Sequence, residues 1–211
     1  MTSDQPDTTT EPDAVTERED DAASASDAGS FAEYAEGLAA RLGAEGWSAE
    51  FDTVRVLVDR GAWLDTLRRA RDEEGLLFFS WLTGVDWARE IAVGEPAEDA
   101  DTLEERYEVI CRLSSIESAE AAHFVATLPK DDAVIDSIVP LFGGAGWHER
   151  EAHEMFGIDF RGNPNLTHLY LPDSFEGHPL RKSFPLLSRE VKPWPGTVDV
   201  EDMPSTENPE A

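Results

Sequence analysis

Residues 146–160 read GWHEREAHEMFGIDF, and the interpretation of the whole chain depends on this stretch. Seven consecutive residues within it hold two histidines and three glutamates. The pattern predicts a helix with a charged face and an apolar side formed by Trp147, Met155 and Phe156. Glutamates that flank an arginine on a helix ordinarily form ion pairs, and nothing in the sequence separates the pKa values of two carboxyls for acid/base work. A charged helix that serves as an interface element is therefore favoured over a catalytic site.

A metal site is the main alternative for this stretch. A metallopeptidase helix of the His-Glu-x-x-His type places its histidines four residues apart on one face. Here His148 and His153 are five apart, which turns their side chains about 140° away from each other on a regular helix. Glu149 with His153, or His148 with Glu151, has helical pair spacing, but two ligands make a weak site. A stand-alone metal-dependent hydrolase that uses His148, Glu149 and His153 is kept as an unfavoured alternative.

The residues before this helix alternate between helical and strand patterns. Phe31, Tyr34, Leu38 and Leu42 recur at helical spacing, with Ser30 as the expected N-cap. Further elements are expected as a strand at 51–58, a helix at 62–71, strands at 76–87, 107–113 and 122–128, and a helix at 135–142 before a Gly-Gly-Ala-Gly turn. This order favours an α+β fold, a two-layer sandwich of helices on a mostly antiparallel or mixed sheet.

Three segments lack such patterns. Residues 1–30 are acidic and polar with few large apolar groups, which predicts a disordered N-terminal tail. Residues 89–106 are acidic, contain proline and glycine, and are expected to form a surface loop. Residues 161–211 are rich in proline and glycine yet hold many large apolar side chains, which fits an extended tail that wraps a partner subunit. The α+β domain is accordingly expected over residues 31–160.

Composition excludes several classes of function. The 211-residue chain has a formal net charge of −28, which disfavours direct binding to nucleic acid or anionic lipid. No apolar run approaches the roughly 20 residues that span a bilayer, so no direct membrane insertion is expected. The one cysteine, Cys111, lies in an apolar run and is expected to be a small buried side chain rather than a nucleophile. The sequence has no Walker A pattern, no G-x-G-x-x-G pattern and no cysteine cluster, so no redox cofactor is expected on this chain.

Two motifs resemble a known family. The first is carried by Glu149, Arg150, Glu151, Glu154, Met155, Phe156 and Gly157. The second runs as Gly177, His178, Pro179, Leu180, Arg181 and Lys182. Together they resemble the 30 kDa subunit, also called the C subunit, of bacterial NADH–quinone oxidoreductase, which is respiratory complex I. The ending at 188–196 is similar to actinobacterial members. The resemblance is firm over 146–200, weaker over 31–145 and absent from 1–30.

The resemblance implies a structural component of the peripheral arm, with no catalytic, cofactor-binding or metal-binding residue of its own. The complex transfers electrons from NADH through FMN and iron–sulfur clusters to quinone and couples this transfer to proton translocation. The implied partners are the D subunit at the quinone site, which we call the quinone-site subunit, the cluster-bearing B subunit and other peripheral-arm subunits. The implied location is peripheral, on the cytoplasmic face of the cell membrane. The two motifs would make intersubunit or tail-anchoring contacts.

The chain departs from the family pattern at two places. Between the motifs it reads Asn163-Pro-Asn-Leu-Thr167, without the basic residue usual at each end of this element, and His153 stands where an aromatic residue is more common. The equivalent subunit of a related membrane-bound, energy-converting hydrogenase is the second alternative to a complex I subunit.

Overall fold

The computed structural model describes residues 20–89 and 102–185, with side chains from Ser30 onward. The described elements, in chain order, are α1 (Asp20–Leu42), β1 (Gly46–Glu50), β2 (Thr53–Leu57), α2 (Trp63–Asp72), β3 (Phe78–Trp87), β4 (Arg106–Ser114), β5 (Ala121–Pro129), β6 (Val134–Asp136), α3 (Ala145–Phe156) and β7 (Asp159–Arg161). These elements confirm the α+β class. No helix in the two described ranges has the length and apolarity that crossing a membrane requires.

The main sheet has five strands in the order β1-β2-β5-β4-β3. Adjacent strands of this sheet run antiparallel, except β2 and β5, which run parallel. The sheet is therefore mixed, as the sequence predicted. A second, two-stranded sheet pairs β6 with β7 in parallel. The two strands of this small sheet lie on either side of α3 in the chain, so their pairing brings together the segments that flank the helix.

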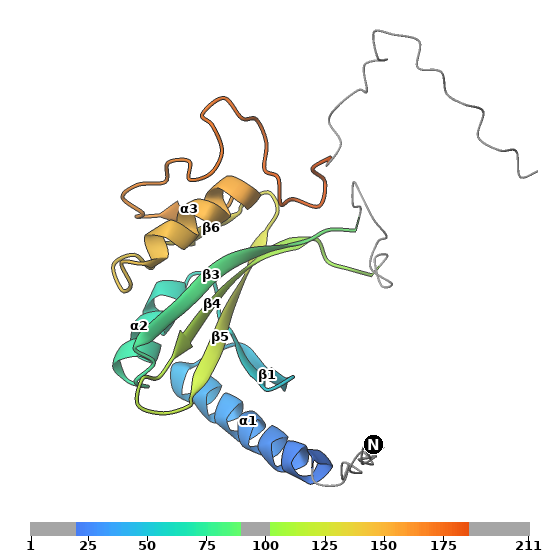
Figure 1. The fold of residues 1–211 in the computed structure, drawn as a ribbon, viewed down its shortest axis with the longest axis vertical. Helices are drawn as coiled ribbons and strands as arrows, with labels where there is room; N and C mark the ends of the chain where they lie inside the picture. The colour runs from blue at the N-terminus through green and yellow to red at the C-terminus, as the bar shows by residue number, and fades with distance from the viewer. Residues whose placement is uncertain (1–19, 90–101, 186–211) are drawn as a thin grey trace, which may run out of the picture.

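The three helices cover one face of the main sheet. Alternate strand residues such as Val56, Cys111 and Phe124 join Leu38 of α1 and Trp63 of α2 in a single buried cluster. Helix α3 packs against β3, and in Figure 1 α2 and α3 lie on the same side of the strands. Cys111 has no exposed surface, and burial raises the pKa of its thiol, which confirms it as a core side chain.

The first helix differs from its prediction. It begins at Asp20 instead of Phe31, so Ser30 lies within the helix and is not its N-cap. Residues 20–30, which were expected to be disordered, are helical because the run to Leu42 is rich in alanine and holds neither proline nor a β-branched residue. Residues 1–19 of the expected tail lie outside the described residues.

Two further predictions of local structure were wrong. Phe51 was placed in the strand expected at 51–58, but Phe51 and Asp52 have φ of 51° and 55° and form the tight turn that joins β1 to β2. The sequence predicted β2 but not β1. The helix expected at 135–142 is absent: strand β6 ends at Asp136, and turns lead to α3. Parallel pairing with the distant β7 decides the conformation of β6. Of the expected loop 89–106, residues 90–101 lie outside the described residues.

Candidate functional site

Both sequence motifs meet at one end of the molecule. The first lies on α3, and the second lies in residues 162–185, which follow β7 and run back along the helix without regular secondary structure (Figure 1). We call residues 162–185 the strap. The tail 161–211 was expected to extend over a partner, but this described portion of it contacts the chain's own helix. Residues 186–211 lie outside the described residues.

Glu154 is the central anchor of the strap. The residue is 3% exposed, and its carboxylate accepts hydrogen bonds from the backbone N–H groups of Leu169 (3.2 Å), Tyr170 (3.0 Å) and Leu171 (2.8 Å). Burial acts to raise the pKa of Glu154, but the three backbone donors outweigh it and the pKa is lowered, with a smaller contribution from His168. A carboxylate that receives three N–H donors in a buried place fixes the backbone of this part of the strap.

The second motif caps the C-terminus of α3. Helical carbonyls in a last turn have no partner within the helix. Here the carbonyl oxygen of Glu154 accepts from His178 Nδ1 at 2.8 Å, that of Met155 from the Leu180 N–H at 3.1 Å, and that of Phe156 from Arg181 Nε at 2.7 Å. The guanidinium of Arg181 also faces the negative end of the helix dipole. The segment Gly-His-Pro-Leu-Arg is therefore a helix cap supplied by residues that come much later in the chain.

Gly157 makes this cap possible. It has φ of 73°, in the left-handed region, and its N–H bonds to the carbonyl of His153 at 2.8 Å. A Cβ at this position would lie 2.6 Å from Nε2 of His178 and would also collide with the guanidinium of Arg181. Glycine is thus required at position 157 both for the backbone conformation and for the close approach of the strap. Just before it, Phe156 packs against Gly84 of β3, where a Cβ would lie 2.8 Å from the ring.

Glu149 ties the start of α3 to both flanking segments. It is fully buried and accepts hydrogen bonds from Ser137 Oγ, the Ile138 N–H and Asn163 Nδ2, each at 2.7 Å. Burial raises the pKa of Glu149 against the opposing effect of these donors. Asn163, one of the departures from the family pattern, is therefore a direct partner of a motif carboxylate.

Arg150 holds the other departure in place. Its guanidinium donates to the backbone carbonyls of Thr167 (2.9 Å) and His168 (2.5 Å) and lies 5.3 Å from the ring centre of Trp147. Because the contact to Thr167 uses only the backbone, the side chain at position 167 is free to vary. Within the described residues Arg150 forms no ion pair with the neighbouring glutamates, although the sequence favoured one.

The far end of the strap is fixed to the sheet. Asp86 of β3 is 5% exposed, accepts the Lys182 N–H at 2.8 Å and pairs with the ammonium group of Lys130. The same ammonium lies 4.2 Å from the ring centre of Tyr107, and the guanidinium of Arg181 lies 5.7 Å from it. Sequence reasoning missed this group, although a carboxylate within the apolar run 76–87 is an informative signal.

The histidines do not form a metal site. His148 Nδ1 contacts the backbone of Leu82 on the edge strand β3, at 3.1 Å from its carbonyl oxygen. His153 Nδ1 contacts the carbonyl oxygen of Ile158 at 2.9 Å. The described residues contain no group of three or more His, Cys, Asp or Glu side chains placed to hold an ion. His148 and His153, the two histidines of the hydrolase alternative, therefore bind two separate backbone segments.

The charged face predicted for α3 is only partly present. Glu149 and Glu154 are buried, which the sequence did not predict, because their donors come from backbone groups and from segments distant in the chain. Glu151 is half-buried and has no hydrogen bond or ion pair within the described residues. It lies beside Trp147 and Tyr170, which are each 64% exposed, and the three line a shallow hollow on the outer side of α3 and the strap.

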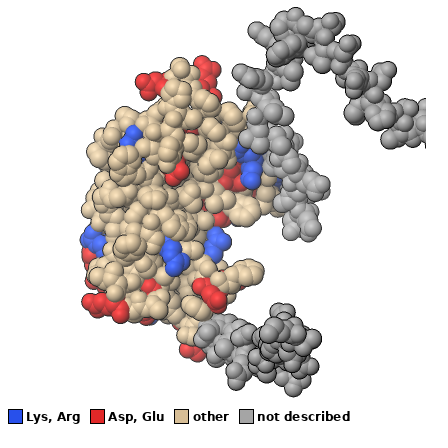
Figure 2. Space-filling model, viewed as in Figure 1, with Lys and Arg blue, Asp and Glu red and all other residues tan. Residues whose placement is uncertain are grey.

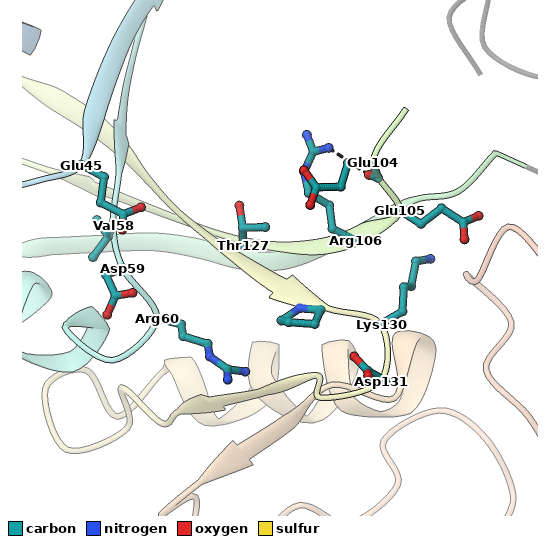
Figure 3. Close-up of a pocket in the computed structure, with 11 residues that line it drawn as sticks. Glu45, Val58, Asp59, Arg60, Glu104, Glu105, Arg106, Thr127, Lys130 and Asp131 are labelled. Atoms are coloured by element: carbon teal, nitrogen blue, oxygen red, sulfur yellow. Dashed lines mark hydrogen bonds between the residues drawn. The ribbon is translucent and has the colours of Figure 1, made fainter. Parts of the chain in front are cut away.

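A separate cleft of about 470 Å³ lies near the ends of β2, β4 and β5 (Figure 3). Its lining mixes both signs of charge and contains no histidine or cysteine. Arg60 on its rim pairs with Asp132 at 2.6 Å, and Arg106 pairs with Glu108 at 3.0 Å. Both arginines are thus held by carboxylates that lie outside the lining of the cleft.

Both motifs fall within a match to a known family. The model of the respiratory-chain NADH dehydrogenase 30 kDa subunit matches residues 56–190. The chain belongs to this family. The C subunit of NADH-quinone oxidoreductase from Citrifermentans bemidjiense is 34% identical over 145 residues, which cover 69% of this chain and 82% of the relative. The C subunit from Nocardioides sp. is 36% identical, with 82% of this chain and 68% of the relative covered.

Some relatives of the family are larger proteins. The C/D protein of NADH-quinone oxidoreductase from Pectobacterium atrosepticum is 39% identical over 110 residues, which make up 52% of this chain but only 17% of that protein. Among solved structures, a chain of the membrane-bound sulfane sulfur reductase, an archaeal respiratory membrane complex, is similar in fold, with a TM-score of 0.59 and 20% identity. The match covers 75% of this chain and 87% of that one. The family is thus one of oxidoreductase subunits, and the fold extends to other membrane complexes.

Proposed function

We propose that the chain is a structural component of the peripheral arm of NADH–quinone oxidoreductase and that it carries no redox centre. The observation that carries this proposal is the use of both motifs: Glu149 and Glu154 hold backbone and amide donors, and Gly177–Lys182 caps α3. Side chains used in this way build a rigid surface, and they leave no group converging on a substrate. FMN, iron–sulfur clusters and quinone would be held by other subunits of the complex.

The outer side of α3 and the strap is the proposed contact for the quinone-site subunit. Trp147 and Tyr170 are each 64% exposed and Leu180 is 52% exposed, a concentration of large apolar side chains typical of protein interfaces. In the view of Figure 2 most of the surface at this end of the molecule is uncharged, and acidic groups gather at its upper edge. The carboxylate of Glu151, which has no ion pair among the residues described, lies beside Trp147 and Tyr170 and suits an arginine or lysine of the partner.

The quinone-site subunit is the favoured partner because relatives named C/D join the C and D subunits in one polypeptide. Two proteins whose genes can be fused must lie close enough for one chain to reach both. We extend the proposal to the cluster-bearing B subunit and to a peripheral position on the cytoplasmic face of the cell membrane. The tail beyond Pro185 would continue over the partner.

The proposal is tested by purifying tagged full-length protein from mild-detergent membranes of the native host and identifying what accompanies it by mass spectrometry. Recovery of the quinone-site, cluster-bearing and flavin-bearing subunits is expected. Glu151→Lys should reduce the recovered quinone-site subunit by about tenfold or more, because it places a cation against the expected cation of the partner. Glu33→Lys, an equal change at an exposed position of α1, is the control and should recover wild-type amounts.

A second candidate is the equivalent subunit of a related membrane-bound complex, such as an energy-converting hydrogenase. It is favoured by the fold shared with the archaeal sulfane sulfur reductase chain. The same purification distinguishes the two, because recovery of hydrogenase subunits in place of flavin-bearing subunits would transfer the protein to that complex. Recovery of the tagged chain alone would overturn both assignments.

A further inference from the structure

One face of the main sheet carries no helix from the two described ranges of the chain. The buried cluster takes Val56, Cys111 and Phe124 from one set of alternating positions, so the other set points away from the helices. That outward set includes Trp81, Arg112, His123 and Arg55, which are neighbours across β3, β4, β5 and β2 in the strand register. We call the outward set the open face. It lies on the opposite side of the sheet from the helices, so it is separate from the outer side of the strap.

The middle of the open face is positively charged. Arg112 Nη1 lies 3.0 Å from Nε2 of His123 and has no carboxylate partner within the described residues. Arg55 lies on the other side of the same histidine, and shares the nearly buried Glu108 with Arg106. Burial, followed by the charges of Arg112 and Arg55, lowers the pKa of His123. At neutral pH the imidazole is therefore an uncharged acceptor between two cations.

This arrangement is unusual in its setting. The chain has 45 acidic and 17 basic residues, so each arginine would ordinarily find a carboxylate partner within the chain. On the open face Glu108 pairs with two guanidinium groups, those of Arg55 and Arg106. The one other acidic strand residue on that face, Glu50, lies on the edge strand β1 without an ion pair in the described residues. Arg112 is half-buried and has no carboxylate partner in the described ranges, so its N–H groups that do not face His123 remain able to bind a carboxylate in a fork geometry.

Apolar side chains border the cations. The adjacent cross-strand row consists of Thr83, Ile110, Val125 and Leu57, of which Leu57 is 41% exposed. Trp81 forms the other border and lies 5.1 Å from His123, ring centre to ring centre. A central charge surrounded by apolar side chains excludes water from an ion pair formed there, which strengthens the pair.

We propose that the open face is a second docking surface, and that its occupant is a segment of a neighbouring protein that places an aspartate or glutamate over Arg112 and apolar side chains over Ile110 and Leu57. The charge complementarity selects this occupant, because phosphate-rich nucleic acid would be repelled by the rest of this chain. The surface is independent of which protein covers the strap, so it does not depend on the contact proposed for the quinone-site subunit.

The test introduces the photo-crosslinker p-benzoyl-phenylalanine at Leu57 in the tagged full-length protein, with all arginines intact, and irradiates mild-detergent membranes of the native host. A crosslink to another polypeptide, mapped to a peptide that contains Asp or Glu, is expected. The same crosslinker at Leu77, which is 49% exposed outside the open face, is the control for collisional labelling and should not yield that peptide. A crosslink only to an acidic segment of this chain, such as 1–19 or 90–101, overturns the proposal, as does no crosslink.

A charge reversal gives an independent measurement. Arg112→Glu should reduce the yield of the Leu57 crosslink about tenfold or more, and Arg68→Glu on the exposed side of α2 should leave it unchanged. An unchanged yield in Arg112→Glu would overturn the proposal, provided that circular dichroism shows it folded. If Arg112→Glu loses the Leu57 crosslink but still recovers the quinone-site subunit in full, the open face is supported as a separate surface. If Glu151→Lys loses the quinone-site subunit but keeps the Leu57 crosslink, the two surfaces are likewise shown to be separate.

Discussion

Replacing Glu154 by glutamine should release the strap from α3 while the sheet stays folded. The carboxylate accepts three backbone N–H groups, two on Oε2 and one on Oε1. Glutamine keeps the shape but converts one of these oxygens into a donor, so at least one N–H of the strap faces another N–H. Hydrogen bonds to charged groups contribute about 1.5–3 kcal/mol each, and we expect strap docking to weaken by about 2–4 kcal/mol.

Hydrogen exchange at the amides of Leu169, Tyr170 and Leu171 measures this effect directly. These amides exchange through local opening of the strap, and a factor of ten corresponds to about 1.4 kcal/mol, so their exchange should accelerate about 30- to 700-fold. The amides of β4 and β5 should keep their protection.

Glu151→Gln is the matched control, because Glu151 lies on the same helix but accepts no hydrogen bond within the described residues. If the two variants show the same exchange rates, or if the strap amides of Glu154→Gln stay protected, the Glu154 carboxylate does not anchor the strap.

Three further outcomes are expected. Gly157→Ala should destabilise the protein by about 2–4 kcal/mol in urea unfolding, because it combines left-handed backbone strain with a collision against His178 and Arg181. Gly43→Ala has equal strain but open space around the new Cβ, and it should cost about 1 kcal/mol. Equal losses of stability would show that the strap moves aside without cost. Arg150→Ala should speed chymotrypsin cleavage after Leu166, Leu169 or Tyr170 without changing the thermal midpoint by more than a few degrees, since it removes two hydrogen bonds to exposed backbone. An unaltered cleavage pattern would contradict this contact. Because the pKa of Glu154 is lowered from its ordinary 4.5, the protection of the strap amides from hydrogen exchange should be complete above pH 4.5 and should disappear as the pH falls through the lowered value. Glu154→Gln should lack this pH dependence. If the variant keeps it, another group causes the transition.

The main elements were predictable because their patterns are local. The helical spacing in Ala62–Arg71 and the apolar runs of β3, β4 and β5 require only neighbouring residues, and the structure places these elements within two residues of the prediction. Elements that depend on distant partners were missed. Strand β6 pairs with β7 across the whole of α3, and the turn at Phe51 uses positive φ at residues without the usual Asn-Gly signature.

The geometry around the two motifs was not predictable from the sequence. The resemblance selected Glu149, Glu154 and the Gly177–Lys182 segment, and the structure brings them together on α3. Their burial could not be read from the sequence, because helical periodicity describes a helix against one neighbour, whereas the strap adds a second neighbour on the other side. Asp86 and Ser137 were missed because each is a single polar residue whose donor or acceptor comes from elsewhere in the chain.

We expect the inner side of the strap and the outer side of α3 and the strap to have different roles, which variants should separate. On the inner side, the last three carbonyls of α3 receive their donors from His178, Leu180 and Arg181, so a change there affects folding before it affects assembly. On the outer side, Glu151 has no hydrogen bond or ion pair within the described residues, and the exposed ring of Trp147 contacts the guanidinium of Arg150. A change at Glu151 should therefore leave the thermal midpoint intact and reduce only the recovery of partner subunits. A protein in which both kinds of variant lost stability equally would have no free outer surface, and the interface would have to lie on the open face alone.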